Sequence, residues 1–86
     1  MTNAATMLEA ITADRKFWRR VTAVIRSART KFGWKSTEKI NARLAEWLEI
    51  NLLHTGIVNT EAATQKDYSE LAPLACDFYN KEYYGK

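Results

Sequence analysis

The sequence predicts an all-α fold: a compact single-domain bundle of four to five helices that spans residues 1–86. Three observations predict it. A length of 86 residues suits one small domain rather than two. An apolar fraction of 47%, with three Trp, four Tyr and three Phe, is too rich for a disordered chain. Three Gly and one Pro are too few for the turns of an all-β fold.

The first helix is expected over residues 3–11, with Asn3 or Thr2 as its N-cap. Its apolar side is formed by Met7, Leu8 and Ile11. A helix this short is not stable alone, so we expect it to dock on the rest of the bundle.

The second helix is the clearest signal in the sequence. Thr12 or Asp14 can cap a helix that runs to Phe32, and Gly33 is a natural stop. Helical spacing brings one apolar face together: Phe17, Val21, Val24, Ile25, Ala28 and Phe32. The opposite side carries Arg15, Arg19 and Arg26, here called the cationic face, flanked by Lys16, Arg20 and Arg29.

No acidic residue lies between Asp14 and Glu38 to balance these charges. Solvent-facing helices usually mix signs, because opposite charges one turn apart attract. The unbalanced cationic face is therefore the main functional signal in the sequence.

The third helix is expected from its N-cap Ser36 to a stop at Gly56. Its apolar stripe comprises Ile40, Leu44, Trp47, Leu48 and Asn51, broadened by Leu52 and Leu53. The link over residues 33–35 is short, so the second and third helices should be neighbours, antiparallel or steeply crossed.

Beyond Gly56 we expect two more helices. One starts at Glu61 after a cap at Asn59 or Thr60 and continues through Tyr68. The last runs from Glu70 or Pro73 to Tyr83, because proline fits only the first turn of a helix or a kink. Its inward residues are expected to be Leu71, Leu74, Ala75, Phe78 and Tyr79.

The net charge of +3 conceals an asymmetry along the chain. Residues 1–45 hold ten basic and three acidic side chains, whereas residues 46–86 hold three basic and seven acidic ones. Such a split indicates a basic contact surface on one side of a folded domain. It is also what two halves that attract each other would show.

The residue types predict no enzymatic activity, metal or cofactor. One Cys and one His can form neither an internal disulfide nor a four-ligand zinc site. Nothing in the spacing of His54 and Cys76 calls for a nucleophile–base pair, and Cys76 is expected in the core. The pair Glu46 and Glu49 is expected on a solvated face. Neither a phosphate loop nor a metal-binding helix motif occurs.

We expect a cytoplasmic protein, in the host cytoplasm if the chain is viral, with no membrane partner. A secretory signal needs an apolar run of about 7–15 residues after basic ones. A membrane span needs about 20 apolar residues. Neither is visible in the sequence.

Aromatic residues supply a second candidate contact surface. We expect the core to use Phe17, Phe32, Trp47 and Phe78, with Trp18 at the edge of its helix's apolar stripe. That assignment leaves Trp34, Tyr83 and Tyr84 either as exposed anchors or as a lid over the junction of the second and third helices.

These features predict a non-enzymatic binding protein: a regulator or inhibitor, of the viral or mobile-element type, that docks on a larger protein or nucleoprotein complex. The alternative is a DNA- or RNA-binding module that uses the same arginines. A homodimer would use the same surplus of aromatics, and the basic surface could instead meet the chain's own acidic half. The candidate partner- or phosphate-binding residues are Arg15, Lys16, Arg19, Arg20, Arg26, Arg29, Trp34, Lys35, Lys39, Arg43, Tyr83 and Tyr84.

Overall fold

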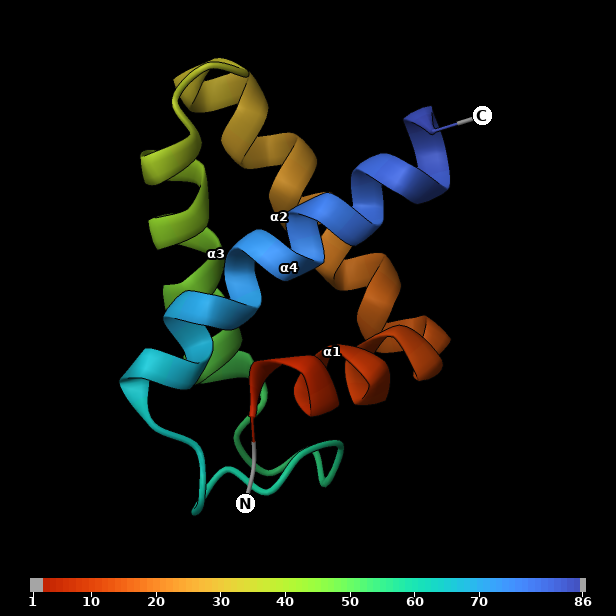
Figure 1. Ribbon diagram of the computed structural model, residues 1–86, viewed down its shortest axis with the longest axis vertical. Coiled ribbons are helices and arrows are strands. Elements are labelled where there is room, and N and C mark those ends of the chain that lie inside the picture. The colour runs from red at the N-terminus through yellow and green to blue at the C-terminus, as the bar shows by residue number, and fades with distance from the viewer. Residues whose placement is uncertain (1–2, 86) are drawn as a thin grey trace.

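Side-chain caps mark where three of the four helices begin. The computed structural model describes residues 3–85, which form α1 (Ala4–Ala13), α2 (Arg15–Phe32), α3 (Thr37–Asn51) and α4 (Gln65–Tyr84) (Figure 1). Asn3 accepts a hydrogen bond from the Thr6 amide, and Asp14 accepts one from the Phe17 amide. The other cap considered for α1, Thr2, lies outside the described residues. The all-α class is thus confirmed, with four helices and no strand within residues 3–85.

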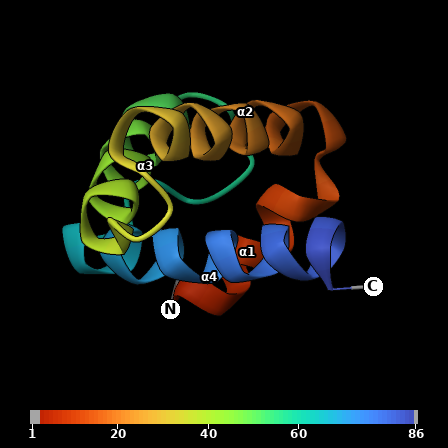
Figure 2. The same cartoon turned by 90° about the horizontal axis from the view of Figure 1, so that it is seen from above.

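The helices form two layers. Figure 2 shows α2 and α3 on one side and α1 and α4 on the other, and Figure 1 shows that α4 crosses α2. Helix α1 packs against α2 and α4, and α3 packs against the same two helices. The radius of gyration is 12.1 Å. Within the described residues no helix is both long and apolar enough to cross a membrane.

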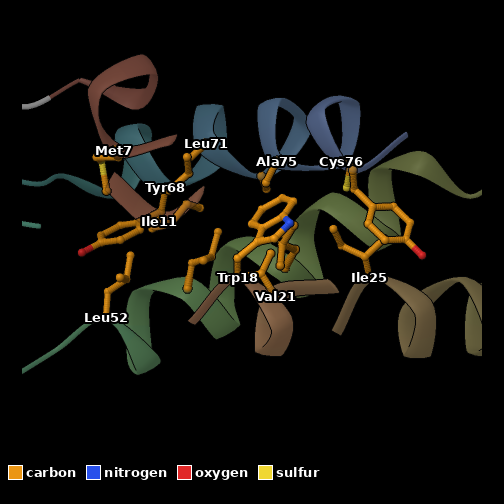
Figure 3. Close-up of a cluster of buried hydrophobic side chains, with 14 of the residues drawn as sticks. Met7, Ile11, Trp18, Val21, Ile25, Leu52, Tyr68, Leu71, Ala75 and Cys76 are labelled. Atoms are coloured by element: carbon orange, nitrogen blue, oxygen red, sulfur yellow. The ribbon is translucent and has the colours of Figure 1, made fainter. Parts of the chain in front are cut away.

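The core lies between the layers and draws on all four helices (Figure 3). Trp18 stands at its centre and is 1% exposed. The Trp18 indole Nε1 donates to Glu82 Oε1 over 3.3 Å, and its ring meets Phe78 edge-on at 5.3 Å between centroids. The structure thus differs from the expected core, since Trp18 is fully buried. Phe78 and Leu74 are each 36% exposed, and Phe32 and Trp47 are half-buried.

Helix α4 differs more from the sequence-based prediction than any other helix described here. The segments expected as separate helices over 61–68 and from Glu70 or Pro73 onward form one helix that begins at Gln65. Thr64 and Asp67 make a capping box: the Asp67 amide donates to Thr64 Oγ1, and the Thr64 amide donates to Asp67 Oδ2.

The helix continues through Pro73 although proline provides no N–H for the carbonyl one turn earlier. Tertiary packing explains why it does so. Two residues before the proline and two after it are buried on the inner face of α4: Leu71, Ala72, Ala75 and Cys76. Burial of this apolar face outweighs the local preference for a break.

Helix α3 is shorter than expected, because it ends at Asn51 rather than near Gly56. The Asn51 side-chain amide donates to the Trp47 carbonyl over 2.9 Å, and buried Leu52 forms the C-cap. His54 then adopts a left-handed φ of 63°, which no helix can continue. At the end of α2, by contrast, Gly33 forms the expected C-cap with a φ of 85°.

Candidate binding surface around helix α2

The cationic face lies in solvent without a counter-charge from the chain itself. Arg15, Arg19 and Arg26 are all exposed. Within residues 3–85, one ion pair brings its charged atoms within 4.0 Å, and it joins Lys66 to Glu70. No arginine of α2 in this range pairs with a carboxylate. The acidic half of the chain therefore does not neutralise this surface within the part that the structure describes.

Neighbouring helices hold two of the exposed arginines in place. Arg20 Nη2 donates to Asn51 Oδ1 over 2.9 Å, and its guanidinium lies 5.3 Å from the Trp47 ring centroid. Arg26 Nε donates to the Tyr79 hydroxyl over 3.0 Å. This hydrogen bond raises the pKa of Arg26 further above its ordinary value, so its charge is permanent. Both side chains are thus partly ordered before any partner arrives, which reduces the entropy lost on binding.

Arg29 differs from the other basic candidates because it is buried, with 9% of its surface exposed. Its Nη2 donates to Asn80 Oδ1 over 2.7 Å, and its guanidinium lies 4.2 Å from the Trp34 ring centroid. Its Nη1 is buried without a hydrogen-bond partner. Arg29 therefore ties the end of α2 to α4 and to the α2–α3 link.

Trp34, Tyr79, Tyr83 and Tyr84 form one aromatic cluster, which adjoins Arg26 of the cationic face. Ring centroids lie 5.5 Å apart for Trp34 and Tyr84 and 4.6 Å apart for Tyr79 and Tyr83. Trp34 and Tyr84 are each 58% exposed and Tyr83 is 47% exposed, whereas Tyr79 is buried. The rings pack together across the link and α4, as a lid would. They also keep much of their surface in solvent, as exposed anchors would.

The remaining basic candidates are also exposed. Lys16 lies at the start of α2, Lys35 follows Trp34 on the link, and Lys39 and Arg43 lie on the outward side of α3. The same side of α3 carries exposed Glu46, whose negative charge would repel nucleic-acid phosphates. Glu46 and Glu49 line a cavity of about 490 Å³ between α3 and α4, together with Lys66 and Tyr68.

Sequence reasoning missed the polar residues of α4 that organise the arginines of α2. Asn80 and the Tyr79 hydroxyl each accept a hydrogen bond from an arginine, and Glu82 accepts one from Trp18. One sequence signal points to this part of α4: Tyr79 and Tyr83 are four residues apart and therefore lie on the same face of a helix. That spacing does not predict which helix the face packs against.

His54 and Cys76, the residues considered as a nucleophile–base pair, lie in different environments. Residues 3–85 contain no group of three or more His, Cys, Asp and Glu side chains able to hold a metal ion. His54 is exposed in the loop after α3, whereas Cys76 is buried on α4. The cavity that Cys76 lines does not include His54.

Cys76 should react slowly with iodoacetamide in the folded protein. Burial raises the pKa of its thiol, and the smaller opposing effect of Arg29 does not reverse this. The folded state favours the neutral thiol of Cys76, so the buried thiol contributes to stability while it is protonated. That contribution is lost as the pH rises through the raised pKa of the folded state. Mass spectrometry at about pH 8, just below the ordinary thiol pKa, should show fast labelling only in denaturant. Rapid labelling without denaturant would contradict the burial.

Comparison with protein-family models, with curated proteins and with solved structures finds no match to this chain.

Proposed function

We propose that this chain is a non-enzymatic binding protein that regulates or inhibits a larger protein or nucleoprotein complex by covering an acidic surface on it. One observation carries the proposal: the cationic face has no counter-charge within residues 3–85. A carboxylate-rich partner surface would supply that charge and would gain speed and specificity of association from it.

The aromatic cluster supports a protein partner. Tyr, Trp and Arg are the residue types that dominate binding energy at protein interfaces. Here two half-exposed rings, Trp34 and Tyr84, lie in contact with each other, and Arg26 lies 5.7 Å from the ring centroid of Tyr83. One arginine of the cationic face, Arg26, thus adjoins the aromatic cluster.

Charge also argues against a second copy of the chain as the partner at this face. A two-fold dimer places the same patch of each subunit against its equivalent. The cationic face would then meet another cationic face, and like charges in contact repel. A partner of opposite charge fits this surface better.

The test reverses charge on the cationic face without touching its neighbours. Arg15 and Arg19 are exposed and make no side-chain contact that holds the fold, so Arg15→Glu with Arg19→Glu should leave helicity by circular dichroism unchanged. The matched control, Lys66→Glu with Lys81→Glu, changes net charge equally on α4. In a nuclease-treated lysate of the native host, the wild type and the control should retain the same protein, and the α2 variant should lose it. Equal retention by all three proteins would show that the cationic face is not the docking surface.

A nucleic acid is the alternative partner, and one observation favours it. Unpaired bases stack on exposed aromatic rings beside arginines, and Trp34 and Tyr84 are such rings. If nucleic acid is the partner, nuclease treatment abolishes retention. Affinity for an oligonucleotide then falls with salt, with a log–log slope of about −0.7 to −0.9 per phosphate contact.

A further inference from the structure

Ile50 is the most exposed large apolar side chain in the described part of the chain, with 61% of its surface in solvent. Trp47 lies one helical turn before it on α3 and Arg43 lies two turns before it, so the three share one side of the helix. Arg20 of α2 joins this side, because its guanidinium lies 5.3 Å from the Trp47 ring centroid. These four residues, here called the Ile50 patch, place an exposed apolar side chain beside two exposed cations on the α2–α3 layer.

The patch keeps its positive charge on the side toward α2. Glu46 also lies one turn from Ile50, but it lines the cavity between α3 and α4. Arg20 reaches α3 from the other neighbouring helix, and its hydrogen bond goes to the amide oxygen of Asn51 rather than to a carboxylate. Neither Arg20 nor Arg43 forms an ion pair within residues 3–85, so both cations are available to carboxylates of another molecule.

A hollow with complementary chemistry lies on the other layer, where the start of α1 meets the middle of α4. Its volume is about 500 Å³, and its lining is mostly apolar with one carboxylate: Asn3, Ala4, Ala5, Glu70, Pro73 and Leu74. Exposed Glu70 and Asp77 lie one turn before and one turn after Leu74 on α4. Asp77 forms no ion pair in the described residues, and Glu70 makes only the long contact with Lys66 at 3.9 Å. This hollow, here called the Leu74 hollow, therefore combines an apolar lining with acidic neighbours.

We propose that the Ile50 patch of one copy of this chain docks in the Leu74 hollow of a second copy. Ile50 then contacts the alanines and Leu74 of the hollow, which removes apolar surface from water on both copies. The two arginines of the patch then face the two carboxylates beside the hollow, so the charges around the apolar contact are of opposite sign. The cationic face contributes no residue to either surface, so this inference does not rest on the proposed function.

The positions of the two surfaces determine the symmetry of the assembly. The layers are stacked along the shortest dimension of the molecule, whose extents are 33 × 25 × 18 Å (Figure 2). Since the patch and the hollow lie on different layers, each copy contacts one neighbour with its patch and another with its hollow. A broad face of up to 33 by 25 Å is comparable with the ~800 Å² that one partner contributes to a standard interface. A two-fold pairing of the patch with itself would instead place like charges in contact.

Sedimentation velocity of the full chain tests the contact. The weight-average sedimentation coefficient should rise from micromolar to millimolar protein at about 50 mM salt, where the screening of exposed charges is weak. Raising the salt to about 500 mM should weaken the association about tenfold, because screening shortens the reach of these charges. A monomer at every concentration in low salt would overturn the proposal, and so would an association that salt does not weaken.

Two variants each disable one of the surfaces. Ile50→Glu places a carboxylate in the patch, which the carboxylates beside the hollow repel, and Leu74→Lys places a cation in the hollow, which the arginines repel. Both positions are exposed, so helicity by circular dichroism should be unchanged. Each variant alone should stay monomeric, whereas an equal mixture should associate, because one variant retains the hollow and the other retains the patch. The proposal fails if either variant alone associates as strongly as the wild type, or if the mixture stays monomeric.

Controls at a loop position separate the contact from a general change in charge. Ala62 is exposed and belongs to neither surface, so Ala62→Glu and Ala62→Lys should associate as the wild type does. Ala5→Lys, on the α1 side of the hollow, should act as Leu74→Lys does, and it replaces that variant if Leu74→Lys lowers helicity. Loss of association in the Ala62 variants would show that net charge governs the association, which contradicts the proposed contact.

Discussion

Trp18→Ala should lower the free energy of unfolding by about 3–5 kcal/mol, which is a large fraction of what a small domain possesses. The side chain is 1% exposed and contacts both Phe78 and Glu82 on α4. Truncation leaves a cavity between the two layers and an unpaired Glu82 carboxylate oxygen. Chemical denaturation followed by circular dichroism measures the loss.

Trp34→Ala is the matched control, because it removes the same side chain from an exposed position. Trp34 is 58% exposed and contacts Arg29 and Tyr84. Its removal should cost about 1 kcal/mol, the size of a partly exposed cation–π contact. Equal losses for the two tryptophans would contradict the position of Trp18 at the centre of the core.

Arg29→Glu should lower the free energy of unfolding by about 3–5 kcal/mol, whereas Arg19→Glu on the same helix should change it by less than about 0.5 kcal/mol. Arg29 is buried and bonded to Asn80, so the variant loses that bond and its contact with Trp34. It also buries a carboxylate in a cavity that Asp77 already lines. Arg19 is exposed.

Thermal or urea denaturation of both variants in parallel measures this difference. If Arg29→Glu were as stable as Arg19→Glu, the guanidinium would be free in solution and would belong with the exposed arginines of α2. The result also determines how binding data are interpreted. Loss of a partner in an Arg29 variant reports on folding as well as on contact, whereas loss in an Arg19 variant reports on contact.

Local signals in the sequence predicted several helix ends well. Asp14 and Gly33 bound α2 as expected, because capping and the left-handed stop depend on residues within one turn. The division of α4 at Pro73 was wrong for the opposite reason. The local cost of an interior proline is outweighed by burial of Leu71, Ala75 and their neighbours against the other helices.

Some features of the candidate surface could likewise be predicted from the sequence, and others could not. The sequence left Trp34, Tyr83 and Tyr84 either as exposed anchors or as a lid, since a domain of 86 residues cannot bury every aromatic ring. In the structure the three rings are partly exposed and also pack within one cluster. The burial of Arg29 and Trp18 could not be predicted, because both lie on the flank of α2 between its apolar and cationic sides. Their partners, Asn80 and Glu82, are more than 50 residues away along the chain.

The sequence by itself determined that the chain is helical and that α2 carries an unbalanced row of arginines, because helical periodicity and capping are properties of neighbouring residues. The tertiary structure decided which of those residues stay in solvent. Helix α4 crosses α2 (Figure 1), and Trp18 and Arg29, which contact residues of α4, are buried. A helical wheel gives the direction in which each side chain leaves its helix. Burial depends on which other helix packs against that side.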